Sequence, residues 1–153
     1  MPSGLIVKEI KGSILDAPQK FIAHGVNCQN VMGSGVAKVL FERYPDVKSR
    51  YHSYCESVAV ESRLGSVCST RFQDDGKIIL NLFTQFRYGY NNKRYVNYAA
   101  IAQCFKNLIT YGTIKEVAIP KIGCGLAGGD WEIVRQIIND ATLDDLDVYV
   151  YYL

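Results

Sequence analysis

Two glycine-rich segments constrain the fold of this 153-residue chain more than any other feature. The first covers residues 28–35 and follows an apolar run at 21–26; the second covers residues 121–129 and follows an apolar run at 117–120. Glycine lets backbone N–H groups approach a ligand that a Cβ would block, and a helix that follows adds unpaired N–H groups and a positive dipole end. Two such loops at the carboxyl ends of strands predict a cradle for a diphosphate.

The length and composition predict a single domain over residues 1–153. Apolar residues make up 48% of the chain and charged residues 21%, and the formal net charge is +2. A chain of this size buries roughly 70% of its unfolded surface without disulfides or metals. The near balance of charge argues against a dedicated duplex-binding protein, whose affinity depends on clustered Lys and Arg.

The five cysteines are odd in number and show no CxxC or Cys/His ligand spacing. This pattern predicts reduced thiols in a cytosolic protein, with no disulfide framework and no metal site. The N-terminus has neither a charged lead nor a long apolar run, and no segment approaches the length that spans a bilayer. We therefore expect a cytoplasmic monomer with no membrane contact and no cofactor.

Apolar periodicity and turn residues predict ten secondary-structure elements. Strands are expected at 5–10, 21–26, 67–72, 78–84, 117–120 and 148–153, and helices at 36–43, 46–58, 95–111 and 131–139. The sequence Asp74-Asp75-Gly76 predicts a hairpin between the third and fourth strands. This order is typical of the α/β class, as a three-layer α/β/α sandwich with a mixed central sheet. Ligands of such sheets bind outside the carboxyl ends of the strands.

His24 and Asn27 lie three residues apart at the end of the second expected strand. An imidazole there could move a proton near neutral pH, and an Asn carboxamide could both donate to and accept from ribose hydroxyls or a phosphate. The alternative for His24 is a partly buried side chain that is hydrogen bonded to backbone. Spacing alone leaves both interpretations open.

Other residues of the two loops have simpler interpretations. Cys28 and Cys124 could be nucleophiles, but small buried thiols that pack beside backbone are commoner. Asp130 is in place to cap the helix that follows the second loop. The loop at 86–94 follows a strand and could be a lid over the site or a solvated surface loop. Neither GxGxxG nor the Walker pattern fits the glycines, which disfavours a nicotinamide dehydrogenase or a P-loop enzyme.

With both loops and the C-terminal strand in view, the chain resembles the macro domain, an ADP-ribose-binding α/β/α module, over nearly its whole length. The residues that carry the resemblance lie at 11–15, 24–37, 120–126 and 150–153. The last two segments are similar to one subclass, which contains ADP-ribose 1''-phosphate phosphatases and glycohydrolases of glutamate-linked ADP-ribose.

The resemblance implies a small-molecule ligand, ADP-ribose or ADP-ribose 1''-phosphate. It implies that the two loops wrap the phosphates, that Asn27 faces the distal ribose, and that the C-terminal strand lies near the adenine. His24 and Asn27 are the expected catalytic residues. The expected ligand-binding residues are Ser13, Ile14, Met32, Gly33, Ser34, Gly35, Val36, Ala37, Thr84, Ile122, Gly123, Cys124, Gly125, Leu126, Ala127, Gly128, Tyr151 and Leu153.

Three departures from the family pattern shape the functional prediction. Gln85 and Ala127 stand where the glycohydrolases carry a catalytic Lys and Asp, and Ser13 stands where many macro domains hold the adenine with an Asp. The prediction is a metal-independent ADP-ribose 1''-phosphate phosphatase. The alternatives are a hydrolase that removes ADP-ribose from protein or nucleic acid, a non-catalytic ADP-ribose reader, and a single-strand binder that uses the loop at 86–94.

Overall fold

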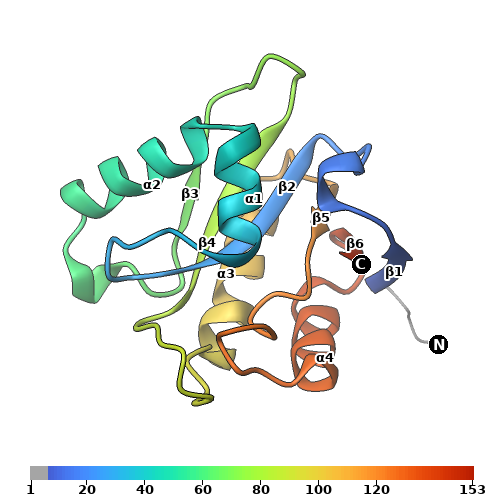
Figure 1. Ribbon diagram of the computed structural model, residues 1–153. Helices are drawn as coiled ribbons and strands as arrows, with labels where there is room; N and C mark the ends of the chain where they lie inside the picture. Colours follow the sequence, from blue (N-terminus) through green and yellow to red (C-terminus); the bar gives the residue numbers. More distant parts are fainter. Residues whose placement is uncertain (1–6) are drawn as a thin grey trace.

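The computed structural model describes residues 7–153 (Figure 1). In these residues the strands are β1 (Val7–Lys11), β2 (Phe21–Asn27), β3 (Val67–Ser69), β4 (Ile78–Gln85), β5 (Glu116–Ile119) and β6 (Asp147–Tyr152). The α-helices are α1 (Gly35–Arg43), α2 (Asp46–Ser57), α3 (Tyr98–Thr110) and α4 (Trp131–Thr142), and short 3-10 helices cover Ile14–Asp16 and Val60–Ser62. The order of elements agrees with the prediction. The predicted start of the first strand, residues 5 and 6, lies outside the described residues.

The strands form one six-stranded sheet in the order β1-β6-β5-β2-β4-β3. The neighbouring pairs are parallel except β3 and β4, which are antiparallel, so the sheet is mixed as predicted. The pairing of β2 with β5 is limited to Ile22 and Ala118, near the start of β2. Beyond that pair the register of β2 against β4 also shifts, between Val26 and Asn27. The end of β2 is therefore free of β5.

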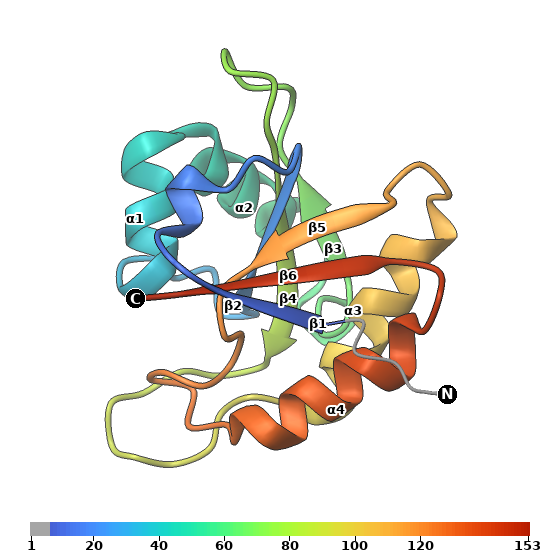
Figure 2. The ribbon, with the colours of Figure 1, turned by 90° about the vertical axis from the view of Figure 1, so that its right-hand side faces the viewer.

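Helices cover both faces of the sheet, as Figure 2 shows. Helices α1 and α2 cover one face over a cluster that includes Ile22, Leu40 and Phe83. Helices α3 and α4 cover the other over a cluster that includes Ala23 and Phe105. Successive residues of β2 enter opposite clusters because side chains of a strand alternate between its faces. The three-layer α/β/α sandwich predicted from the sequence is confirmed, and no helix of residues 7–153 is long and apolar enough to cross a bilayer.

Three predicted boundaries differ by three residues. The helix predicted at 131–139 extends to Thr142, and the other two boundaries give way to longer-range hydrogen bonds. The helix predicted at 95–111 begins at Tyr98, because Tyr95 N and Val96 N donate to Ala127 O and the Asn97 side chain caps the helix. The strand predicted at 67–72 ends at Ser69, since the Arg71 N–H donates to the Asp46 carboxylate instead of continuing the ladder.

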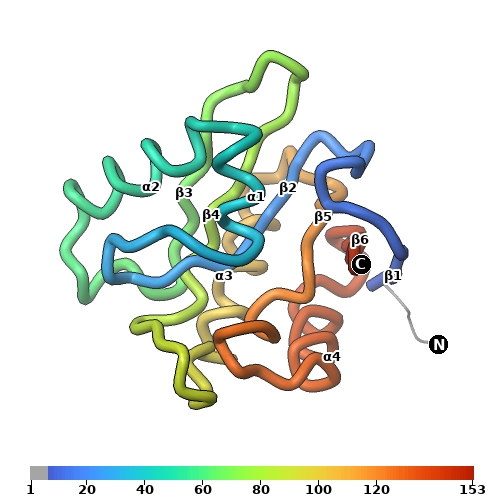
Figure 3. The backbone as a smooth tube through the Cα atoms, in the orientation of Figure 1, coloured from blue at the N-terminus to red at the C-terminus, as the bar shows by residue number. Residues whose placement is uncertain are grey.

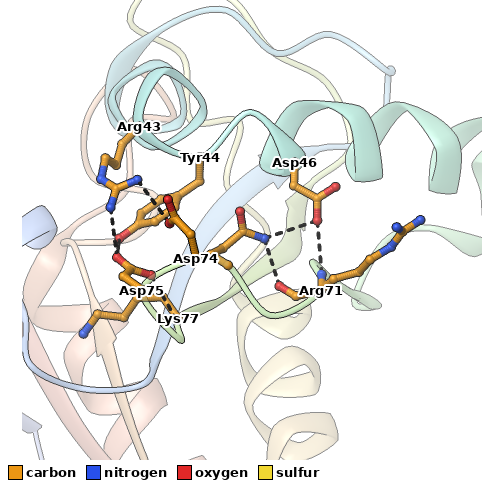
Figure 4. Close-up of polar contacts among 8 residues, drawn as sticks. Arg43, Tyr44, Asp46, Arg71, Asp74, Asp75 and Lys77 are labelled. Atoms are coloured by element: carbon orange, nitrogen blue, oxygen red, sulfur yellow. Dashed lines mark hydrogen bonds and ion pairs between the residues drawn. The ribbon is translucent and has the colours of Figure 1, made fainter.

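The hairpin predicted at Asp74-Asp75-Gly76 is confirmed, with Gly76 at φ +83°. The Asp75 carboxylate accepts hydrogen bonds from Tyr44 at 2.7 Å and from Arg43 at 3.2 Å, which tie the hairpin to the end of α1 (Figure 4). In the tube drawing of Figure 3 this hairpin lies at the opposite end of the molecule from the loops at 86–94 and 121–129. The second glycine-rich loop and the loop at 86–94 therefore lie far from this network.

Candidate functional site

A cavity of about 370 Å³ opens at the carboxyl ends of β2, β4 and β5. This size lies within the usual range for small-molecule sites. The cavity is lined by His24, Gly25, Val26, Asn27, Val31, Met32, Gly33, Ser34, Gly35, Val36, Ala37, Gln85, Tyr88, Gly89, Tyr90, Pro120, Lys121, Ile122, Gly123, Gly125, Leu126 and Ala127. Both predicted loops therefore meet at one site, although Gly35 and Gly123 lie 88 positions apart in the sequence.

The N-terminus of α1 forms one wall of this cavity. Ser34 stands at the N-cap position, but its side chain makes no capping hydrogen bond. The first-turn residues Gly35, Val36 and Ala37 all line the cavity. The backbone N–H groups of a first helical turn have no partner within the helix, and they carry the positive end of its dipole. This wall is thus suited to an anion.

The opposite wall is the loop at 121–129. Its turn is closed internally, because Gly129 N donates to Gly123 O at 2.7 Å and Gly128 N donates to Gly125 O at 3.1 Å. Within residues 7–153, no hydrogen bond uses the N–H groups of Gly123, Gly125, Leu126 and Ala127, and all four residues line the cavity. Gly123 has φ +76°, a conformation that favours glycine. The loop therefore presents a second set of free donors.

The polar side chains of the cavity are amides, hydroxyls, one imidazole and one amine. None of the lining residues within the described part of the chain is an Asp or a Glu. The Lys121 amine lies 5.0 Å from the Tyr152 ring centroid and 5.9 Å from that of Trp131. A cavity with free N–H groups, a nearby cation and no carboxylate favours a negatively charged ligand.

Asn27 is fixed by the loop that it begins. Its Oδ1 accepts from Gln29 N at 2.9 Å and from the Tyr51 hydroxyl at 2.9 Å, and its Nδ2 donates to Val31 O at 2.8 Å. An amide nitrogen carries two protons, so one N–H of Asn27 remains beyond the Val31 bond. Asn27 lines the cavity and can offer this donor to a ligand.

His24 borders the cavity, but its side chain is only 1% exposed. Its Nε2 donates to Asn81 Oδ1 at 2.5 Å, and the Asn81 amide donates in turn to Val47 O. Nδ1 is buried and has no hydrogen-bond partner among residues 7–153. Burial lowers the pKa of His24 from 6.5 to about 4, although the Asn81 hydrogen bond raises it. This geometry favours the structural alternative for His24, with a side-chain partner in place of the expected backbone one.

The two cysteines that follow the strands are poorly suited to nucleophilic attack. Burial raises the pKa of Cys28 to about 11, and it raises the pKa of Cys124 to about 11 as well. Both are therefore thiols, not thiolates, at neutral pH. Cys124 Sγ contacts Ile122 O at 3.3 Å, and Cys124 does not line the cavity. The packing interpretation of both thiols fits this arrangement.

The loop at 86–94 forms part of the cavity wall through Tyr88, Gly89 and Tyr90. The Tyr90 hydroxyl lies 3.5 Å from Ser34 Oγ, so this loop reaches the N-terminus of α1. Figures 1 and 2 show the loop beside the second glycine-rich loop, to which the Tyr95 and Val96 N–H groups bind at Ala127 O. This arrangement favours a lid over a freely solvated surface loop.

Seven of the predicted ligand-binding residues do not line the cavity: Ser13, Ile14, Thr84, Cys124, Gly128, Tyr151 and Leu153. Ser13 Oγ accepts from Leu15 N, and the Tyr151 hydroxyl donates to Gln19 Oε1 at 2.9 Å. Leu153 is 94% exposed. The adenine contacts predicted for Ser13, Tyr151 and Leu153 stay a prediction.

Several lining residues were not among the predicted catalytic or ligand-binding residues: Gly25, Val26, Val31, Tyr88, Gly89, Tyr90, Pro120 and Lys121. Gly25 had a usable signal, because a glycine inside an apolar strand often marks a close approach. A Cβ at Gly25 would lie 2.6 Å from Thr84 Oγ1 and 3.2 Å from Ile122 Cγ2. Thr84 itself is fully buried beneath this glycine.

The fold and the paired loops agree with a comparison against known families. The model of the Macro domain matches residues 23–138, a range that contains every residue of the cavity lining. The chain therefore belongs to the Macro domain family, as its sequence indicated.

Three relatives show how the similarity is distributed. An uncharacterized 17.5 kDa protein of Enterobacteria phage T4 is 36% identical over 143 residues, which cover 88% of this chain and 89% of the relative. The DNA ADP-ribosyl glycohydrolase of Mycobacterium tuberculosis is 31% identical over 92% of this chain, which spans 40% of that protein. The human ADP-ribose glycohydrolase OARD1 is 28% identical over 99% of this chain and 95% of its own.

Solved structures give the same result. A protein of unknown function from Bacteroides thetaiotaomicron superposes with a TM-score of 0.83 at 27% identity and covers 96% of this chain and 98% of its own. The macrodomain of Mycobacterium tuberculosis DarG superposes with a TM-score of 0.79 at 29% identity and covers 98% of this chain and 99% of its own. The fold is that of a macro domain.

Proposed function

We propose that this protein binds ADP-ribose 1''-phosphate in the cavity and hydrolyses its phosphate monoester, releasing ADP-ribose and phosphate. The proposal rests mainly on the two walls of the cavity, which both present backbone N–H groups as hydrogen-bond donors. The uncapped N-terminus of α1 and the free N–H groups of Gly123, Gly125, Leu126 and Ala127 line the same cavity, and the lining holds no carboxylate within the described residues. Such a site suits a ligand with several phosphate oxygens.

ADP-ribose is the proposed core of the ligand because relatives in this family act on ADP-ribose compounds by name. They include the glycohydrolases above and the ADP-ribose 1''-phosphate phosphatase of Debaryomyces hansenii, which is 24% identical over 95% of this chain. The two walls would hold the diphosphate, and Asn27 would hold the terminal ribose through its remaining N–H.

The proposed reaction needs little from the side chains. A water oxygen attacks phosphorus, the bond from phosphorus to the O1'' oxygen breaks, and that oxygen leaves with a proton as the ribose hydroxyl. The backbone N–H groups of the loop stabilise the charge that develops on the phosphoryl oxygens. No step requires His24, whose ring nitrogens are buried; its predicted role in proton transfer stays a prediction that a substitution can test.

Removal of ADP-ribose from a nucleic acid is the second candidate. The 31% identity to a DNA ADP-ribosyl glycohydrolase over 92% of the chain favours it. In the family pattern that describes the glutamate-specific enzymes, however, Gln85 and Ala127 replace the Lys and Asp pair. An amide nitrogen is not a nucleophile, and Ala127 cannot exchange a proton. A non-catalytic reader would use the same cavity without turnover.

A paired turnover assay distinguishes these candidates. The purified protein is incubated, without added metal, with ADP-ribose 1''-phosphate and separately with ADP-ribosylated single-stranded DNA and ADP-ribosylated glutamate peptide. The proposal predicts phosphate release that exceeds both deribosylation rates. Efficient DNA deribosylation with negligible phosphate release would instead assign the second function. Tight binding of ADP-ribose with no turnover of any substrate would identify a reader.

A further inference from the structure

The buried face of α2 carries a polar atom that packing does not require. Val47, Tyr51 and Cys55 recur every four residues along α2 and are all buried, as expected for the stripe that faces the sheet. Tyr51 is fully buried, and its ring stacks on Phe83 of β4 with the centroids 5.7 Å apart. A phenylalanine would fill the same space, so the hydroxyl needs a separate explanation.

The Tyr51 hydroxyl lies beneath the loop that leaves β2. It is 2.8 Å from Asn27 O and 2.9 Å from Asn27 Oδ1, and it accepts from Val31 N at 3.1 Å. One hydroxyl thus contacts both ends of the five-residue turn from Asn27 to Val31. Asn27 and Val31 line the cavity, whereas Tyr51 does not. The hydroxyl can influence the ligand only through this turn.

Other hydrogen bonds also tie the 27–31 turn to its surroundings: Cys28 N and Gln29 Nε2 donate to Phe86 O, and Asn30 Oδ1 lies 2.5 Å from His52 Nδ1. Within residues 7–153, however, only the Tyr51 hydroxyl bonds the Asn27 side chain and the Val31 N–H from outside the turn. The remaining bonds of the Asn27 side chain, to Gln29 N and Val31 O, lie within the same turn, so they cannot fix the turn against the rest of the molecule. Nearby, the Arg63 guanidinium donates to Cys28 O at 2.6 Å and holds the backbone without touching the Asn27 amide. Burial raises the pKa of Tyr51, so its hydroxyl keeps its proton through the neutral range.

We infer that Tyr51 is a positioning residue: its hydroxyl holds the Asn27 side chain and the Val31 N–H so that the 27–31 turn faces the cavity in one conformation. The consequence for ligand affinity rests on the proposed function, because the ligand is taken to be ADP-ribose. The hold on the turn itself does not depend on any ligand.

The test is Tyr51→Phe with two matched tyrosine controls. Tyr54→Phe changes the same helix and another ring beside Phe83, 5.2 Å away, but its hydroxyl has no hydrogen bond within residues 7–153. Tyr44→Phe removes a buried hydroxyl that bonds to Asp75 at the far end of the molecule (Figure 4). Tyr44→Phe thus reproduces the loss of a buried hydrogen bond without touching the cavity.

Two measurements separate positioning from general stability. Amide hydrogen exchange of Val31 and Gln29 should accelerate about tenfold or more in Tyr51→Phe and stay unchanged in both controls. Calorimetry with ADP-ribose should show affinity weakened about tenfold in Tyr51→Phe, while Tyr44→Phe lowers the melting temperature but keeps its affinity. In an Asn27→Ala background, Tyr51→Phe should weaken binding by much less, because the two groups act together.

Each outcome decides the inference. Unchanged exchange at Val31 and Gln29 in Tyr51→Phe overturns it, and so does accelerated exchange with full affinity. If the wild-type protein does not bind ADP-ribose, the proposed function fails. The exchange experiment then still decides the role of Tyr51, with acceleration confined to the turn as the supporting result.

Discussion

Replacement of His24 by Gln tests whether this histidine is structural. The wild-type side chain is neutral and buried, with the pKa lowered from 6.5 to about 4. Between these two pKa values the unfolded chain binds a proton that the folded protein excludes. The free energy of unfolding therefore falls as the pH drops from 6.5 toward 4. Below pH 4, His24 lowers it no further.

The lowering of the pKa sets the size of this effect. Each pKa unit corresponds to about 1.4 kcal/mol, so His24 should account for about 3 kcal/mol of stability lost between pH 7.5 and pH 4. In His24→Gln the amide can still donate to Asn81 Oδ1, but it does not titrate. The variant should therefore lose about 3 kcal/mol less than the wild type over the same range.

Urea unfolding measures this difference at pH 7.5, 6, 5 and 4, with the single tryptophan, Trp131, as the fluorescent probe. Carboxylates that titrate near pH 4 are common to both proteins and cancel in the comparison. The control variant His52→Gln retains His24, so its free energy of unfolding should fall with pH as steeply as that of the wild type. The same variants are assayed for phosphate release: a structural His24 predicts turnover within a few fold of the wild type. Two results would refute the structural role of His24. One is a free energy of unfolding that falls with pH equally in His24→Gln and the wild type; the other is a loss of turnover of about 10²-fold in His24→Gln with binding unchanged.

Three further substitutions test the packing around the site, each by urea unfolding. Gly25→Val should destabilise the fold by about 1–3 kcal/mol, since its Cβ would lie 2.6 Å from Thr84 Oγ1; an unchanged midpoint would mean the strands separate easily. Leu40→Ala empties a fully buried position under α1 and should cost about 2–5 kcal/mol; less than 1 kcal/mol would contradict the packing of α1 on the sheet. Asp130→Ala removes the acceptor for Glu132 N and Ile133 N and should cost about 1 kcal/mol, whereas no change would mean that this cap is dispensable.

Local sequence signals predicted the elements of this fold well because periodicity and turn chemistry are local. Asp130 is the cap of α4, as its position before an apolar repeat indicated. Longer-range pairings moved two of the boundaries that were wrong. Tyr95 and Val96 have helical neighbours in sequence, but their N–H groups bind Ala127, which lies more than thirty positions away.

The local nature of these sequence signals also explains which parts of the site could be predicted. The glycines at 33, 35, 123 and 125 could be assigned because glycine before a helix has a specific physical use, and all four line the cavity. Tyr90 could not be assigned, since its contact with Ser34 depends on how two loops meet. For His24, the local signal was the three-residue spacing from Asn27, which suggested a catalytic role. Its burial depends instead on α2 and β4, which cover it and are distant in sequence.

Calorimetric titration of the purified protein with ADP-ribose, for the wild type and for Gly125→Val, tests whether the two glycine-rich walls form the ligand site. Gly125 lines the cavity, and a Cβ there would meet nothing within 4 Å, so the variant should fold normally while its side chain fills ligand space. We expect metal-independent heat of binding for the wild type, no detectable binding for Gly125→Val, and equal melting temperatures for both. Equal ADP-ribose affinity in the two proteins, or no heat from the wild type at millimolar ADP-ribose, would contradict the claim that the two glycine-rich walls form the ligand site.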